Sequence, residues 1–436
     1  MDRERAETYL RLLAEAELRR ATTIAAGSLP GQWRSTRLEL AAQALCAVGA
    51  VSAGVADEIQ ADVGLAVAGR YQHSIYRPGR PRSGPTPQGA SYRVVPVGQV
   101  IKLRNDDLRG ELLVVAYARS GGGARLIVVG RPFPPFAAAD DQGVSYQVTW
   151  SGGHTASELL LRPDPSHQIR WLDFTGAVEA ATRIDLDPRL PGSDVTVTPT
   201  AQSPGELLLE VVAARILSIV AYRPRDNPGP LTASAGLRAF IGDGPGHIVD
   251  ALHAAGVLPP DSPVPGQLAG LCARLGIDGH GISVPPDGDL PERWHSMLTP
   301  AHRHEPQTPP VSGVLAATVA ELPEPDGAKI AIVGLTHGLH AGEPRTIMHL
   351  LAGGVTLEDD WKFARGVRPL PVLWIRDSNG RWHTTRTDGI RPWRDSGVVT
   401  VWLEIVPPLD SGTAWIEISA ARPAAQARVT LPLSSQ

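Results

Sequence analysis

The chain has almost no lysine: Lys102, Lys329 and Lys362 are the only lysines in 436 residues. Nearly all of its positive charge is therefore arginine, and the formal net charge is −4. This mildly acidic balance argues against the basic surface that proteins binding a phosphate backbone usually carry. We therefore expect no nucleic-acid partner.

Cysteine and long apolar runs are also scarce. The two cysteines, Cys46 and Cys272, lie far apart in apolar, helix-like patterns and make no disulfide framework. No run approaches the roughly 18 apolar residues that a membrane span requires. The first residues, Met1–Arg5, are charged and do not form an apolar signal core. We expect a cytoplasmic protein with no membrane partner.

The remaining pattern predicts an α+β protein of several domains. Apolar residues recur at helical spacing in the N-terminal part, whereas later regions contain short strand-like runs separated by turn residues. The expected units are an N-terminal helical unit (1–76), a Pro/Gly/Arg linker (77–91), a first β-sandwich (92–200), a helical segment (204–300) and a second β-sandwich (311–436).

The helical segment contains two ambiguities. Residues 208–220 fit a helix, although their β-branched side chains leave a strand possible. Residues 237–275 have a helix-turn-helix outline that would suit a DNA-binding protein. However, residues 236–282 contain two arginines, four aspartates and no lysine, which is the wrong charge for phosphate contacts.

The last third of the chain repeats a pattern found between residues 90 and 190. Leu159–Phe174 aligns without a gap on Leu403–Ile418, and Asp140–Gly143 aligns on Asp377–Gly380. In both copies an aromatic residue follows the Asp-x-x-Gly turn within a few positions. The repeat predicts two similar antiparallel sandwiches, of which the immunoglobulin-like type is favoured, without its usual cysteine pair.

Histidine is the one reactive residue type that is unevenly distributed. Three imidazoles with a carboxylate can hold zinc or iron, so a cluster deserves consideration as a metal site. The spacing matches no metalloenzyme signature such as H-E-x-x-H, and the first pair lies among prolines, where surface histidines are common. The cluster runs from His295 to His349, and its candidate ligands are His302, His304, His337 and His340.

Two tryptophans are candidate binding residues. If Val399, Val401, Leu403 and Ile405 face the core of a sheet, Trp402 lies on the opposite face, and Trp415 is likewise opposite Ile416. An exposed tryptophan on a sheet would suggest a partner surface. The preferred interpretation is that the predicted helices of the same chain cover these faces.

Three segments carry a resemblance to known proteins: Ala6–Arg19, Leu45–Val51 and Trp171–Asp173. They resemble a family of actinobacterial proteins with tandem immunoglobulin-like modules. The resemblance implies a tandem β architecture, but no activity, cofactor or site residue.

These observations favour a non-enzymatic binding or assembly scaffold whose partner is another protein. A metal-dependent enzyme that uses the His295–His349 cluster is the alternative, and a regulator acting through the helical segment is a third possibility. No cofactor motif is present, so we expect no cofactor. The sequence leaves the oligomeric state open.

Overall fold

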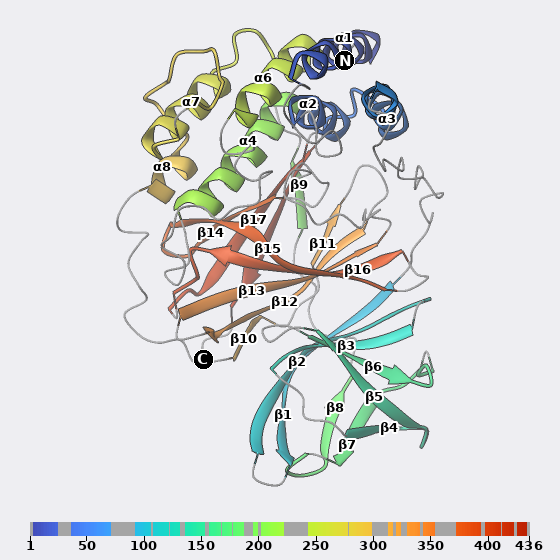
Figure 1. Ribbon diagram of the computed structural model, residues 1–436. Helices are drawn as coiled ribbons and strands as arrows, with labels where there is room; N and C mark the ends of the chain where they lie inside the picture. Colours follow the sequence, from blue (N-terminus) through green and yellow to red (C-terminus); the bar gives the residue numbers. More distant parts are fainter. Residues whose placement is uncertain are drawn as a thin grey trace.

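Figure 1 shows the computed structural model of the chain. It describes residues 3–24, 36–70, 92–105, 108–121, 123–130, 136–152, 157–166, 168–176, 178–186, 195–198, 202–221, 243–277, 279–298, 313–316, 320–323, 329–340, 343–353, 372–393, 397–410, 412–422 and 425–433.

The described helices are α1 (Arg3–Ile24), α2 (Thr36–Ala47), α3 (Ala53–Arg70), α4 (Pro204–Ile216), the π-helix η2 (Leu217–Ala221), α6 (Gly244–Ala254), α7 (Val264–Arg274) and α8 (Glu292–Leu298). Within the described residues, no helix is long and apolar enough to cross a membrane.

The strands of the first β unit are β1 (Tyr92–Asn105), β2 (Leu108–Ser120), β3 (Gly123–Val129), β4 (Phe136–Asp140), β5 (Ser145–Gly152), β6 (Ser157–Arg162), β7 (Trp171–Gly176) and β8 (Thr182–Asp185). Those of the second are β9 (Val195–Thr198), β10 (Gly313–Ala316), β11 (Ala320–Pro323), β12 (Lys329–His340), β13 (Glu343–Gly353), β14 (Val372–Asp377), β15 (Trp382–Pro392), β16 (Val398–Val406), β17 (Trp415–Arg422) and β18 (Ala425–Pro432).

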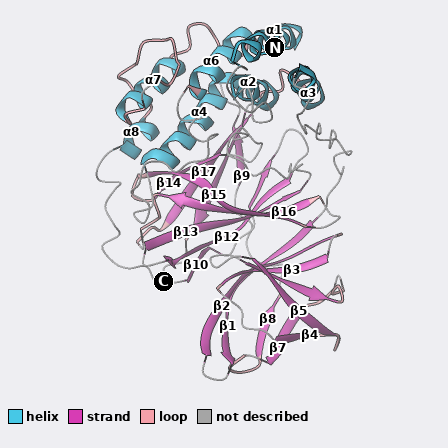
Figure 2. Cartoon of the chain, viewed as in Figure 1, coloured by secondary structure: helices cyan, strands magenta, loops and turns pink. Residues whose placement is uncertain are grey.

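Three layers follow one another along the molecule. The helices form one end, the second β unit lies in the middle, and the first β unit forms the other end (Figures 1 and 2). All strand pairs in both units are antiparallel. The predicted α+β arrangement is confirmed: N-terminal helices, two antiparallel β units and a helical segment between them in the sequence.

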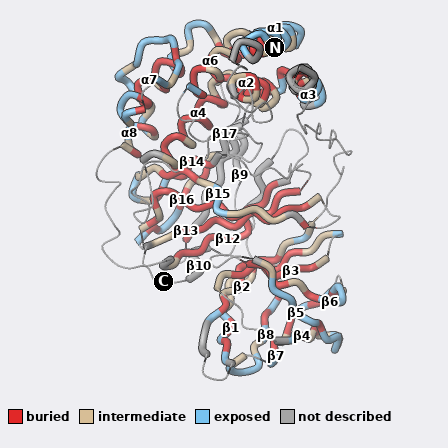
Figure 3. The backbone as a smooth tube through the Cα atoms, in the orientation of Figure 1, coloured by how far each residue is buried: buried red, intermediate tan, exposed pale blue. Residues whose placement is uncertain are grey.

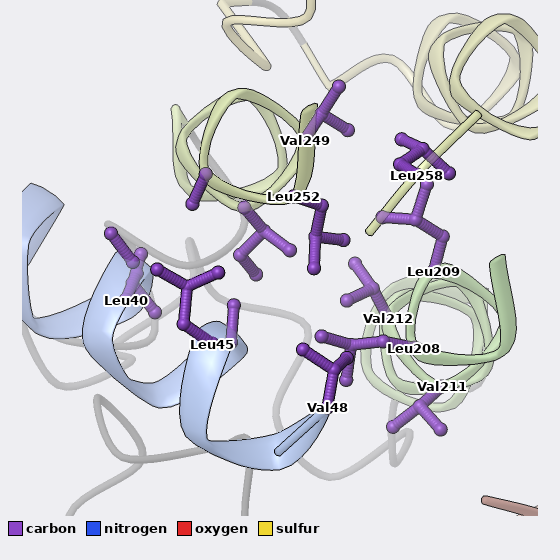
Figure 4. Packing of buried hydrophobic residues seen from close by; sticks show 14 of the residues in the cluster. Leu40, Leu45, Val48, Leu208, Leu209, Val211, Val212, Val249, Leu252 and Leu258 are labelled. Atoms are coloured by element: carbon purple, nitrogen blue, oxygen red, sulfur yellow. The ribbon is translucent and has the colours of Figure 1, made fainter. Parts of the chain in front are cut away.

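The N-terminal helices and the helical segment share one hydrophobic core. Figure 4 shows Leu45 of α2, and Val48 just after that helix, facing Leu252 of α6 and Leu208 of α4, and all four side chains are buried. Trp374 of β14 belongs to the same cluster. Each set of helices therefore buries its apolar face against the other and, through Trp374, against the second β unit.

Helix α4 and the π-helix η2 that follows it resolve the ambiguity over residues 208–220 in favour of a helix. Helix α4 begins with a reciprocal capping box, in which the Ser203 hydroxyl accepts the Glu206 N–H at 3.2 Å and the Glu206 carboxylate accepts the Ser203 N–H at 2.8 Å. Such a box satisfies two backbone donors that would otherwise have no intrahelical partner. It also fixes the position of the Glu206 side chain.

Helix α7 packs closely against the chain segment that follows it, and glycine permits this approach. A Cβ atom at Gly270 would lie 2.0 Å from the carbonyl oxygen of Asp287. We expect Gly270→Ala to lower the free energy of unfolding by about 1–3 kcal/mol, because a buried overlap forces the backbone to move. Urea denaturation measures the change. Gly288→Ala is the control, since a Cβ there meets nothing within 4 Å, and equal stability of the two variants would contradict the prediction.

The two β units share a strand order. The first sheet runs β1-β2-β3-β6-β5-β4-β7-β8, and the second contains β12-β13-β16-β15-β14-β17-β18 in succession. Adding ten to each strand number from β2 to β8 gives its counterpart in the second unit. This shared topology agrees with the repeat seen in the sequence.

The Asp-x-x-Gly turns also match in detail. Asp140 Oδ1 accepts the N–H groups of residues 142 and 144, both at 2.9 Å. Asp377 Oδ1 accepts those of residues 379 and 381, at 2.9 and 2.8 Å. Gly143 and Gly380 have φ angles of 76° and 78°, in the left-handed region that glycine adopts without strain. The turn chemistry is therefore the same in both copies.

Each β unit is one continuous, barrel-like sheet. In the first unit the Glu179 N–H donates to the Lys102 carbonyl at 2.9 Å, and Leu103 bridges Val178, so the segment before β8 returns to β1. The second unit forms a single ten-stranded sheet that includes β9, a strand from residues 195–198 that pairs with β18. Barrel-like sheets thus replace the two separate sheets of the immunoglobulin-like sandwich that we predicted.

The two β units are joined through a buried interface. Val115 and Ile127 of the first unit pack with Val333, Leu351 and Trp393 of the second. Figure 3 shows buried residues on both sides of this interface between the β units. The two sheets are therefore packed against each other and are not independent domains.

A charged pair lies within that interface. Glu158 is fully buried and forms an ion pair with Arg125 of its own unit. The same carboxylate accepts a hydrogen bond from Trp393 Nε1 at 3.1 Å and another from the Thr400 hydroxyl, both in the second unit. The Arg125 guanidinium also lies 4.4 Å from the centroid of the Trp393 ring.

Candidate functional site

The structure places the predicted histidine candidates as follows. His302 and His304 lie outside the described residues. His340 ends β12, and its side chain is not among those described. His337 is buried on β12, with Nδ1 at 2.7 Å from the Thr346 hydroxyl oxygen. His295 is exposed on α8, and its Nδ1 lies 3.2 Å from a guanidinium nitrogen of Arg274.

In the described part of the chain, no three His, Cys, Asp or Glu side chains are grouped so that they could hold a metal ion. Burial lowers the pKa of His337 to about 4, which favours a neutral imidazole that hydrogen-bonds to Thr346. The metal-dependent enzyme stays a prediction, because two of its four candidate ligands lie outside the described residues.

Two further histidines on the second β unit were not named as candidate ligands: His349, the last member of the predicted cluster, and His383, which lies outside it. His349 is fully buried, with Nε2 at 2.9 Å from the Thr336 hydroxyl, and burial lowers its pKa to about 3. His383 has Nδ1 at 2.8 Å from the Pro407 carbonyl oxygen, and Nε2 at 3.5 Å from the buried carboxylate of Asp377. These hydrogen bonds hold neighbouring strands and the residues after β16 together.

The two candidate tryptophans differ in exposure. Val399, Val401, Leu403 and Ile405 face the core of the second unit, as predicted. Trp402 is on the opposite face but is only 5% exposed, because its ring packs on Ile347 and over Gly389. Trp415 is 39% exposed. Of the two, only Trp415 offers its ring to a partner.

The helices cover the outer face of β14 and β15. Two tryptophans lie on this face, whereas the equivalent positions of the first β unit hold small residues. Trp374 is 1% exposed under the helical layer, and Trp382 packs partly against it. The aligned turns place Ala137 and Ser145 at the equivalent positions of the first unit. Large aromatic side chains on one copy of the repeat therefore give the helices an apolar surface to pack on.

A cleft of about 380 Å³ lies where the helices meet this face. Its wall includes the first turns of α4, α7 and α8 together with Trp382 of β15. Its charged lining residues are Glu206, Glu210, Glu292 and Arg293. Among the residues that the structure describes, the lining thus carries three carboxylates and one guanidinium.

Two of these carboxylates have fixed partners. Glu210 is 2% exposed, accepts a hydrogen bond from Trp294 Nε1 at 2.8 Å and pairs with Arg293 through both of its oxygens. Glu206 accepts the Ser203 N–H and the Ser262 hydroxyl at 2.8 and 2.7 Å. Burial acts to raise the pKa of Glu206, but these hydrogen bonds outweigh it and the pKa is lowered, so the group is ionised at neutral pH.

Trp382, which lines the cleft, shares its sheet face with exposed residues of the neighbouring strands. Across the strands, Arg376 of β14 pairs in register with Trp382 of β15 on one side and with Glu417 of β17 on the other. The Arg376 guanidinium lies 5.8 Å from the centroid of the Trp382 ring. Trp415 is two residues before Glu417 and therefore shares this face. We call these four residues, Trp382, Arg376, Glu417 and Trp415, the junction surface.

Sequence reasoning identified Trp415 but missed the cleft. The cleft brings together residues from 206 to 382 that no local pattern connects. Only the S-x-x-E spacing of Ser203 and Glu206 was a readable local signal, because it is typical of a helix start.

Comparison of the chain with protein-family models, curated proteins and solved structures returned no match. The resemblance to actinobacterial proteins is thus supported only in its coarser implication, the presence of two antiparallel β-sheet units.

Proposed function

We propose that this chain is a binding or assembly protein that engages another protein through the junction surface. The observation that supports it best is Trp415, a tryptophan 39% exposed on the same sheet face as the cleft. Tryptophan and arginine are the side chains most often responsible for binding energy at protein interfaces. Trp415 and Arg376 lie together on one rigid sheet, beside a hollow that can receive a partner's side chain.

The architecture supports the same proposal. The two β units are held together by a buried interface, and the helices cover the remaining aromatic face of the second unit. The junction surface is therefore carried on rigid elements, which lowers the entropy cost of binding.

Replacement of Trp415 by alanine tests this function. A protein that co-purifies stoichiometrically with this chain is first isolated from cells of the source organism. We expect its affinity for the Trp415→Ala variant to be about 30-fold lower, the loss typical of an interface hot spot. Binding of the purified pair is measured by surface plasmon resonance. The fold should persist, because the ring is partly exposed.

Trp150→Ala is the matched control, since Trp150 is an exposed tryptophan (47%) of the first β unit. It should bind the partner as the unchanged chain does. Absence of any stoichiometric partner, or equal affinity for both variants, would refute the proposal.

A further inference from the structure

We infer that the cleft is a receptor for one lysine or arginine side chain of the partner protein, an inference that rests on the proposed function. The first argument is charge. Glu210 and Arg293 neutralise each other as a pair, which leaves Glu206 and Glu292 as an excess of two negative charges on the lining.

Helix dipoles reduce this excess but do not cancel it. The cleft is lined by the first turns of α4, α7 and α8, and a helix N-terminus acts as about half a positive charge. Together these three termini offset about one and a half of the two negative charges. The balance stays negative, which favours a cation over an anion.

The form of the cleft suits a cation on a flexible apolar stem. Its volume of about 380 Å³ is at the small end of the range for ligand pockets, which fits one side chain better than a larger ligand. Val264, Pro291 and Trp382 supply apolar wall next to the carboxylates. Lysine and arginine bury their methylene stems against such surface while the charged end reaches polar groups, and an indole ring attracts a cation to its face.

One of these two carboxylates is held in place before any ligand arrives. Glu206 is fixed by Ser203 and Ser262, and each of its oxygens keeps a lone pair for a further donor. Glu292 opens α8 at the exposed edge of the cleft, and the described residues provide it with no ion pair. The cation is therefore received between one fixed carboxylate and one at the rim.

The inference is tested on the full chain with N-butylguanidinium, which reproduces an arginine side chain, and with N-butylurea, which has a similar shape without the charge. Binding is followed through the indole N–H resonance of Trp382, assigned by its loss in Trp382→Phe. We expect N-butylguanidinium to shift this resonance in a saturable way, and N-butylurea to bind at least tenfold more weakly.

Glu292→Gln should weaken binding of N-butylguanidinium about two- to fivefold, as expected for loss of one partly exposed charge pair. Glu111→Gln, an exposed glutamate of the first β unit, should leave the affinity unchanged. Equal binding of the urea and the guanidinium, or equal affinity of both variants, would overturn the inference.

These results are separable from those for the proposed function. If Trp415→Ala loses the partner but the guanidinium does not bind, the cation receptor is wrong and the binding protein stands. If the guanidinium binds but Trp415→Ala keeps full partner affinity, the proposed protein interface is wrong.

Discussion

Glu158→Ala is expected to lower the free energy of unfolding by about 3–5 kcal/mol, the cost typical of removing one partner from a buried ion pair. The substitution would leave the Arg125 guanidinium, which is 6% exposed, without its counter-charge inside the interface between the β units. It would also remove the acceptor that the first unit offers to Trp393 and Thr400 of the second. Urea denaturation followed by tryptophan fluorescence measures the loss.

An exposed ion pair of the first β unit provides the control. Arg183 and Asp173 form two hydrogen bonds of 2.9 Å, but their side chains are 53% and 32% exposed. Asp173→Ala should therefore cost no more than about 1 kcal/mol. Glu158→Gln separates charge from hydrogen bonding, because the amide can still accept from Trp393. A cost below about 1 kcal/mol for Glu158→Ala would show that the pair does not hold the interface.

Acidification is expected to destabilise the protein strongly, well above the pH at which carboxylates usually titrate. Burial lowers the pKa of His337 to about 4 and of His349 to about 3, whereas both have a pKa near 6.5 in the unfolded chain. Below pH 6.5 the unfolded chain therefore binds protons that the folded chain does not, and stability falls as pH falls. With about 1.4 kcal/mol per pH unit for each histidine, the loss from pH 7.5 to pH 5 is about 4 kcal/mol.

Carboxylates extend the effect at lower pH. The pKa values of Asp140 and Asp377 are lowered, because hydrogen bonds to the ionised groups outweigh the effect of burial. Their contribution to stability is present above pH 4 and is lost as pH falls through the lowered values. As pH falls, the two buried histidines therefore reduce stability first, and the two turn aspartates reduce it at lower pH.

Urea denaturation at several pH values checks the prediction. In His349→Gln the loss between pH 7.5 and pH 5 should fall to about half, because one of the two buried imidazoles is gone. His295→Gln, at an exposed position of α8, is the control for the substitution itself. A stability that does not change between pH 7.5 and pH 5 would contradict the assignment of both histidines as neutral buried groups.

Local signals in the sequence were sufficient for the turns and the repeat. Asp140 and Asp377 each begin a turn whose glycine must adopt a positive φ, so residue identity alone identifies the position. Alternation along β16 also assigned its core face, because side chains on a strand point to opposite sides in turn. These features depend only on residues close together in the chain.

Features that depend on distant segments could not be derived in this way. Alternation placed Trp402 opposite the core, but nothing local indicated that Ile347 would cover it or that the helices would cover Trp374 instead. His349 lies on the face of β13 that also carries Leu351, a member of the interface with the first β unit. The packing on that face involves segments distant in the sequence, and such packing has no sequence period.

The path of the chain through the layers determines the order in which the protein can be completed during synthesis. The helical core combines residues before 70 with residues after 203, and the second sheet takes β9 from residues 195–198. The first β unit lies wholly between these parts, so it can close while the ribosome is still translating. The helical core must wait for α8, and β9 must wait for β18, close to residue 432. The nascent N-terminal helices thus keep an apolar face uncovered until the residues after 203 have been synthesised, the stage at which chaperones act on emerging chains.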